Sequence, residues 1–252
     1  MRSWKTLLVS AAALALAACQ PTIGDAPGIG GGVPLSDAAP GNGDPSTVDG
    51  GSVEPRPDGG PGGPRDVTLS QTTSDQILDL HSRACVEQNE EDEPVQNREN
   101  SYYRVFDLAA AGIDGDFEVS SVTFGIESAS TPDDSSQPAT VRLHTLEGDL
   151  LISGLTQVAS KDIQITPQGQ TTLEVPISTS VAAGSTVVAE LFVPNSTEGR
   201  LFFIGSNDLG ESEPGYLRAP ASGCDFIEPT QFDNVDPGSE IHIVLQISGT
   251  EL

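Results

Sequence analysis

The three histidines, His81, His144 and His242, are the side chains best suited to act as bases or zinc ligands at neutral pH. They lie in separated runs, and none belongs to the His-Glu-x-x-His pattern of zinc-binding helices, so we expect surface strand positions for them. No Gly-x-Ser-x-Gly sequence supplies a serine nucleophile. Asp and Glu together number 37, so no carboxylate pair stands out as a general acid and base. The sequence therefore predicts a protein that is not an enzyme.

Calcium is the cofactor that acidic turns could hold, because it takes carboxylate and carbonyl oxygens as ligands in irregular loops. The candidate ligands are Asp114 with Asp116, and Asn207 with Asp208. Neither pair has the spacing of an EF-hand loop. We expect solvated turns and no cofactor, with one structural calcium ion as the alternative.

The N-terminal segment has a basic head, Arg2 to Lys5, and an apolar run, Leu7 to Ala18, that ends in Leu16-Ala17-Ala18-Cys19. The run is shorter than the roughly 20 residues that a helix needs to cross a bilayer, but it suits a signal peptide. This order of features resembles the lipobox of bacterial lipoproteins. The resemblance implies that residues 1–18 are a lipoprotein signal peptide and that Cys19 is acylated. The alternative is an ordinary signal peptide cut at an Ala-x-Ala site.

Acylation at Cys19 would hold the protein at a membrane surface. Each buried methylene contributes about 0.8 kcal/mol, so two or three acyl chains make the attachment effectively permanent. Gln20 stands where the inner-membrane retention signal of enteric bacteria has Asp, so the resemblance implies the outer membrane or the cell surface. The expected partners are the membrane, through the lipid, and an extracellular protein or glycan.

Residues 19–66 are expected to be a disordered, acidic tether that follows the lipid. Nearly half of the residues from Gln20 to Asp66 are Gly or Pro, and apolar side chains are too sparse to offset the entropy of ordering. The whole chain carries a net charge of -26. Nucleic acid is therefore excluded as a partner, because phosphate binding needs a basic surface.

Residues 67–252 contain short runs in which apolar and polar side chains alternate with period two, as in half-buried strands. In one run Tyr102, Arg104 and Phe106 face one way, while Tyr103 and Val105 face the other. Turn-forming clusters separate roughly eight to ten such runs. They predict one monomeric all-β domain, an antiparallel β-sandwich of jelly-roll or immunoglobulin-like type. Residues 74–80 could form a helical turn, or residues 77–81 could open the first sheet.

Cys85 and Cys224 are the two cysteines that remain after Cys19. An exported protein lies in a compartment where disulfides persist, so we predict that these two are joined. The bridge would close most of the domain into a loop and contribute on the order of 4 to 5 kcal/mol in the chain-entropy model. Two buried free thiols are the alternative.

Three segments, 100–108, 203–207 and 214–220, resemble a β-sandwich domain that secreted bacterial peptidases and surface proteins carry as a non-catalytic accessory module. In that group a Cys-Gly-x-x-Glu-Pro-Thr pattern follows, whereas residues 223–230 have the Gly and Cys inverted. The resemblance extends over most of residues 75–249. It implies an accessory or adhesive role and supplies no catalytic residues.

Arg104 and Arg218 are two of few cations in an acidic domain, so we expect each to pair with a carboxylate such as Asp107 or Glu228. An aromatic and cationic rim could also stack on a sugar ring or grip a peptide carboxylate, and its candidate residues are Tyr102, Tyr103, Tyr216 and Arg218. The sequence thus favours a lipid-anchored extracytoplasmic binding or accessory module. A carbohydrate-binding module at the cell surface is the first alternative, and a hydrolase with an unrecognised site is the second.

Overall fold

The computed structural model describes residues 22–25, 63–91 and 93–252, and it gives only the backbone for residues 22–25. The predicted signal peptide, the lipidation site Cys19 and most of the predicted tether lie outside the described residues. No helix in the described part is long and apolar enough to span a bilayer.

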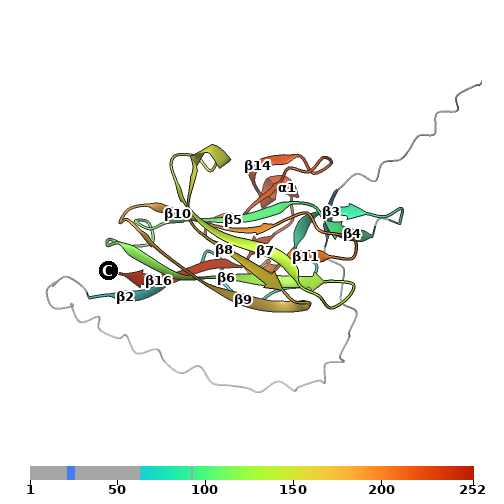
Figure 1. Ribbon diagram of the computed structural model, residues 1–252. Helices are drawn as coiled ribbons and strands as arrows, with labels where there is room; N and C mark the ends of the chain where they lie inside the picture. Colours follow the sequence, from blue (N-terminus) through green and yellow to red (C-terminus); the bar gives the residue numbers. More distant parts are fainter. Residues whose placement is uncertain (1–21, 26–62, 92) are drawn as a thin grey trace, which may run out of the picture.

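Two antiparallel sheets pack face to face and form the body of the domain (Figure 1). The first sheet has the order β14-β13-β5-β10-β7-β8, with the bounds Phe226–Gln231, Tyr216–Ala219, Asn100–Asp107, Thr186–Val193, Gln137–Leu146 and Leu155–Ile165. The second has the order β11-β6-β16-β2, with β9 also on β6, and the bounds Leu201–Ile204, Phe117–Ser130, Leu245–Glu251, Arg65–Leu69 and Gln168–Val181. The predicted all-β antiparallel sandwich is confirmed.

Smaller elements complete the chain. They are β1 (Thr22–Asp25), β3 (Arg83–Gln88), β4 (Pro94–Asn97), β12 (Ser206–Asn207), β15 (His242–Ile243), the 3-10 turn η1 (Ile152–Gly154) and the short helix α1 (Phe232–Val235). Strand β1 lies within the range predicted as a tether and pairs with β3, and β2 begins two residues before the predicted start of the domain. β-branched Thr22 and Ile23 give β1 a local preference for extended backbone.

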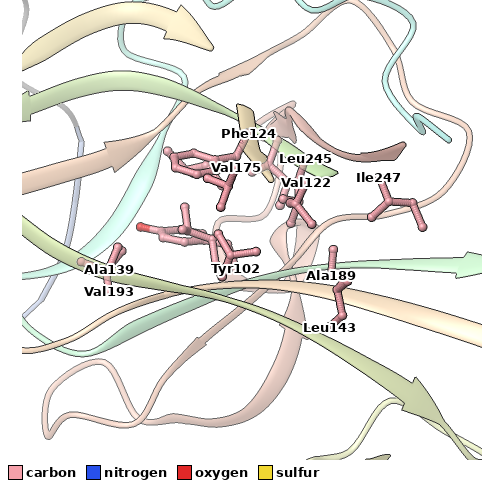
Figure 2. Packing of buried hydrophobic residues seen from close by; sticks show 14 of the residues in the cluster. Tyr102, Val122, Phe124, Ala139, Leu143, Val175, Ala189, Val193, Leu245 and Ile247 are labelled. Atoms are coloured by element: carbon pink, nitrogen blue, oxygen red, sulfur yellow. The ribbon is translucent and has the colours of Figure 1, made fainter. Parts of the chain in front are cut away.

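The core lies between the two sheets and is built by alternate residues of the strands. In β10 the side chains of Val187, Ala189, Leu191 and Val193 face it, and all four are fully buried. Tyr102 of β5 packs there beside Phe124, Val175 and Leu245 from the opposite sheet (Figure 2). Period-two alternation therefore decides which side chains of each central strand remain on the outer face.

Residues 74–82 form neither the predicted helical turn nor a strand. Two buried side chains hold this segment instead. The Asn207 amide donates to the carbonyls of Ser74 (2.9 Å) and Gln76 (3.0 Å), and the Glu127 carboxylate accepts from the amides of Leu80 (2.9 Å) and His81 (3.2 Å). Burial raises the pKa of Glu127 to about 7, against the opposing effect of those two amide donors. These backbone amides and carbonyls thus have hydrogen-bond partners although the segment belongs to no sheet.

A disulfide joins Cys85 in β3 to Cys224 in the turn between β13 and β14, which confirms the predicted pairing. The two Cα atoms lie 6.1 Å apart, and the cysteines are separated by 139 residues. Both cysteines are buried against the main core. The bond therefore ties the small β1-β3-β4 sheet to the far edge of the first sheet.

Replacing both cysteines, Cys85→Ser with Cys224→Ser, should lower the free energy of unfolding by about 4 to 5 kcal/mol, because the unfolded chain regains the entropy of a long loop. Urea unfolding of the oxidised wild type and the double variant measures this. Reduced wild type serves as the matched control and should behave like the variant. Equal midpoints for the oxidised wild type and the double variant would contradict the prediction.

Candidate functional site

A row of polar side chains crosses the outer face of the first sheet. The register places Tyr103 of β5 opposite Tyr216 of β13 on one side and opposite Glu190 of β10 on the other, while Glu190 lies opposite Arg142 of β7. Directly opposite residues of neighbouring strands share a face, so these four form one row. Their face is the outer one, because the residue after Glu190, Leu191, packs in the core.

Glu190 is the centre of this row and is only 3% exposed. Its Oε1 accepts hydrogen bonds from the Tyr103 hydroxyl (3.2 Å) and Arg142 Nη1 (3.1 Å), and its Oε2 accepts one from His144 Nε2 (2.8 Å). We call Tyr103, Arg142, His144, Glu190 and Arg218 the outer-face cluster. It brings together side chains from four strands.

Glu190 is ionised in this setting. Burial alone would raise its pKa, but the hydrogen bond from His144 and the charge of Arg142 outweigh burial and hold the pKa below its ordinary value. Burial and the nearby Glu190 charge raise the pKa of Tyr103, so its phenol stays protonated and remains a donor. An ionised carboxylate only accepts, and therefore His144 carries a proton on Nε2.

The other ring nitrogen of His144, Nδ1, is buried and has no hydrogen-bond partner among the described residues. A buried polar atom without a partner costs about 1–3 kcal/mol. The ring lines a hollow of about 270 Å³ over the outer-face cluster.

One wall of the hollow comes from the β7-β8 connection, which contains η1, and from the start of β8, with Ile152, Leu155 and Gln157 in the lining. This connection rises above the first sheet near its edge strand β14 (Figure 1). The connection and β14 are joined by a hydrogen bond from the Ile152 amide to Glu228 Oε2 (2.8 Å). Apolar side chains on these two segments are exposed, with Leu151 at 45%, Ile152 at 39% and Ile227 at 65%. Ile152 and Leu155 line the hollow, which thus has a charged floor and an apolar part of its wall.

Both arginines of the outer-face cluster are held in place yet remain accessible. The Arg142 guanidinium lies 4.2 Å from the centroid of the Phe192 ring and pairs with Glu190. Arg218 pairs with Glu99 (2.7 Å) and donates from Nε to the Ile227 carbonyl (2.9 Å). The two side chains are 28% and 23% exposed. Each guanidinium has five donors, so each keeps N–H groups for a ligand.

The predicted partners of the arginines, Asp107 and Glu228, were wrong. Arg104 pairs with Glu211 (2.7 Å) and donates to the Ile243 carbonyl, and Arg218 pairs with Glu99. Asp107 and Glu228 instead accept from the backbone amides of Ala110 and Ile152. Asp107 lies at the end of β5, where it accepts within its own turn, so it does not pair with Arg104.

The structure separates the predicted aromatic rim. Tyr102 is fully buried in the core, and its hydroxyl donates to the Arg83 carbonyl, so it does not reach the surface. Tyr103, Tyr216 and Arg218 do share the outer face, although Tyr103 is only 1% exposed and forms part of the floor. Glu190 and Arg142 were absent from the sequence-based set. The signal for Glu190 was a lone carboxylate within the apolar run 187–193.

The candidate calcium ligands have other roles or stand apart. Asp116 accepts from the Ala183 amide, Asn207 holds residues 74–76, and Asp208 lies 3.5 Å from His81 Nε2. The backbone amide of Asp114 donates to Glu251 Oε1. In the part of the chain that the structure describes, no three His, Cys, Asp or Glu side chains are placed to hold a metal ion. Calcium binding stays a prediction.

Each histidine ring in the described residues is engaged by a group other than a nucleophile. His144 bonds to Glu190, His81 Nδ1 contacts the Asp79 carbonyl, and His242 Nδ1 accepts from the Gly210 amide. The expected surface position was wrong for His144, which is only 7% exposed. Its burial follows from the pairing with Glu190 and from the segments that cover it.

No family model matches this sequence, and no curated protein matches it. Among solved structures, the cysteine protease and lectin-like domains of a surface-layer-associated protein of Clostridium difficile align with a TM-score of 0.42 at 13% identity, over 62% of this chain and 32% of that one. A clostridial cysteine protease after propeptide cleavage aligns with a TM-score of 0.41 at 15% identity, over 62% of this chain and 36% of that one. An archaeal aminopeptidase aligns with a TM-score of 0.24 at 9% identity, over 72% of this chain and 37% of that one. This chain spans about a third of the length of each of these proteins. At such TM-scores and identities the alignments do not establish a shared function.

Glu190→Gln should lower the free energy of unfolding at pH 7 by on the order of 3 kcal/mol, because it leaves Arg142 without its buried counter-ion and replaces the carboxylate that accepts from Tyr103 and His144. The depressed pKa adds stability above the ordinary value of 4.5, and this stability is lost as the pH falls through the folded-state pKa. The gap between wild type and variant should therefore narrow in acid. Urea unfolding from pH 7 to pH 3 measures it.

Glu99→Gln is the matched control, since it removes a carboxylate that is 31% exposed from the other arginine of the cluster. We expect a loss of about 1 kcal/mol or less there. Equal losses for the two variants, or a gap for Glu190→Gln that does not change with pH, would contradict an ionised buried Glu190.

Proposed function

We propose that this chain is an exported, lipid-anchored surface protein whose β-sandwich binds a carbohydrate through the outer-face cluster and does not catalyse a reaction. The observation that carries the proposal is the buried, ionised Glu190, held by three donors at the floor of an open hollow. The hydrogen bonds fix these side chains before a ligand binds, so binding does not have to pay the entropy cost of ordering them.

The chemistry of the hollow suits a sugar ring. Hydroxyl groups need both donors and acceptors, and Arg142 and Arg218 provide spare N–H groups above the Glu190 carboxylate. The C–H face of a sugar needs an apolar surface, which Ile152 and Leu155 provide in the lining of the hollow. A pocket with apolar walls and a few fixed polar groups is the usual form of a small-molecule site.

Binding is favoured over hydrolysis by the state of the same groups. A general acid must hold a proton near neutral pH, whereas the pKa of Glu190 is depressed by His144 and Arg142. The other ring nitrogen of His144, Nδ1, has no hydrogen-bond partner among the described residues, so no Ser or Thr hydroxyl is bonded to it as a nucleophile would be. The hydrolase alternative therefore lacks support from the geometry of this cluster.

The anchor belongs to the same proposal. Its support is the order of the basic head, the apolar run and Leu16-Ala17-Ala18-Cys19 in the sequence. Lipid on Cys19 would hold the sandwich at the outer membrane or cell surface, where extracellular glycans are accessible. The net charge of -26 keeps such a protein soluble above the membrane and disfavours polyanionic ligands.

A glycan array probed with the soluble Cys19→Ser protein should give a restricted set of bound sugars. Arg142→Gln and Arg218→Gln should each weaken the best sugar about tenfold, which corresponds to one lost charge-assisted hydrogen bond of about 1.4 kcal/mol. Isothermal titration calorimetry measures the affinities. Arg65→Gln is the matched control, because Arg65 pairs with Glu251 on the second sheet. A flat array, or equal affinities for all three variants, would contradict the proposal.

Cys19→Ser should move the full-length protein from the membrane fraction to the soluble fraction of cells that process lipoproteins, since no acyl chain remains to hold it. Immunoblots of separated fractions and the mass of the mature N-terminus measure this. If the variant pellets with membranes as the wild type does, with its leader still attached, the anchor is wrong and the ligand proposal must stand on the sandwich alone.

A further inference from the structure

A second hollow, of about 540 Å³, shares no lining residue with the hollow over the outer-face cluster. It is bounded by residues 69–71, which begin at the last residue of β2, by residues 105–107 at the end of β5 and by residues 212–214 before β13. Leu69 and Phe106 give it apolar walls. This hollow, which we call the β5 groove, contains none of the five cluster residues.

The β5 groove lies along a strand edge that loses its neighbour. β13 pairs with β5 from Arg218 opposite Ser101 to Tyr216 opposite Tyr103, and the ladder stops there. Continuing the same register by two residues would place Pro214 opposite Val105. Proline has no N–H and cannot donate to a ladder, so pairing with this edge ends where β13 begins.

A side chain takes the place of the missing donor. Gln71 Nε2 donates to the carbonyl of Val105, which is the group that a paired strand would contact. The other end of the same amide, Oε1, is buried without a partner among the described residues, and Gln71 is 9% exposed overall. The Gln71 Nε2 group thus makes the hydrogen bond that the N–H of a paired strand would make. The Gln71 Oε1 atom lacks a donor, which an added strand could supply.

The charge of the β5 groove selects the peptide that could fill it. Asp107 and Glu213 line it and both are exposed, and none of its described lining residues is Lys or Arg. A basic side chain on an added strand would meet these carboxylates. Alternate side chains of that strand would meet Leu69 and Phe106.

From this geometry we propose that the β5 groove binds an extended basic peptide segment of a partner protein, which adds to residues 105–107 of β5 as an edge strand. The peptide's N–H replaces Gln71 Nε2 at the Val105 carbonyl, and the released Gln71 amide turns toward the bound peptide. Main-chain hydrogen bonds supply the recognition, as in other cases of strand addition. Lysine or arginine at alternate positions supplies the preference for this edge.

The test uses the soluble Cys19→Ser chain, isotope-labelled, and a capped peptide of sequence Lys-Val-Lys-Val-Lys. Nuclear magnetic resonance titration should shift the Gln71 side-chain amide and the backbone amides of residues 105–107. The same peptide with every backbone nitrogen methylated has no N–H group to donate to the Val105 carbonyl and should bind at least tenfold more weakly. A Glu-Val-Glu-Val-Glu peptide should also bind at least tenfold more weakly.

Gln71→Ala removes the internal competitor for the Val105 carbonyl and should tighten the lysine peptide about tenfold. Gln137→Ala is the matched control, because Gln137 is a buried glutamine with an unpartnered amide on β7, outside the β5 groove. It should leave peptide affinity unchanged, as should Arg218→Gln in the outer-face cluster.

Three results would each overturn the proposal: equal affinity of the lysine and N-methylated peptides, shifts confined to the outer-face cluster, or a folded Gln71→Ala variant that binds no tighter than wild type. If Gln71→Ala does not fold, the comparison of the two peptides on the wild type decides alone. Failure here leaves the sugar-binding proposal intact, because the two sites share no residue among those that line them.

Discussion

The need to pair a buried carboxylate on a central strand sets the arrangement of the first sheet. Glu190 sits in β10, which has β5 on one side and β7 on the other, and both neighbours must offer donors at the same level. A one-residue slip of β10 would exchange faces, so the charge would enter the apolar core and Leu191 would leave it. An unpaired buried charge costs several kcal/mol, and this penalty specifies the register more strongly than apolar packing alone.

A second buried charge links the first sheet to the small β12-β15 sheet. Arg104 is fully buried in β5, pairs with Glu211 and donates to the carbonyl of Ile243 in β15. Burial lowers the pKa of Arg104, while Glu211 opposes that effect and keeps the guanidinium charged. β5 therefore carries a polar side chain bonded to a carboxylate on each face, Tyr103 to Glu190 outside and Arg104 to Glu211 inside. This strand positions the floor of the outer hollow and the open edge beside Gln71 at the same time.

The sequence allowed the fold to be predicted where the signal was local, and the site was missed where it was not. Alternation predicted the strands, and export chemistry predicted the bond between Cys85 and Cys224. The partners of Glu190 lie 46, 48 and 87 residues away, so no local spacing could reveal them. Tyr102 and Tyr103 were grouped in one rim, although adjacent strand residues point to opposite faces. Residues 74–82 follow no periodic pattern because their backbone partners are distant side chains, those of Glu127 and Asn207.

The two hollows differ in how a ligand would have to bind, and this difference follows from their hydrogen bonds. In the outer-face cluster Glu190 already has three donors, so a ligand gains only the spare N–H groups of Arg142 and Arg218. Such a site is selective for shape and donor position, and it suits a small rigid ring. In the β5 groove the Gln71 side-chain amide donates to the Val105 carbonyl at the strand edge. A peptide must displace this hydrogen bond before its own N–H can pair with β5. The net binding energy there is the difference between two similar hydrogen bonds, so charge and apolar contacts decide the affinity.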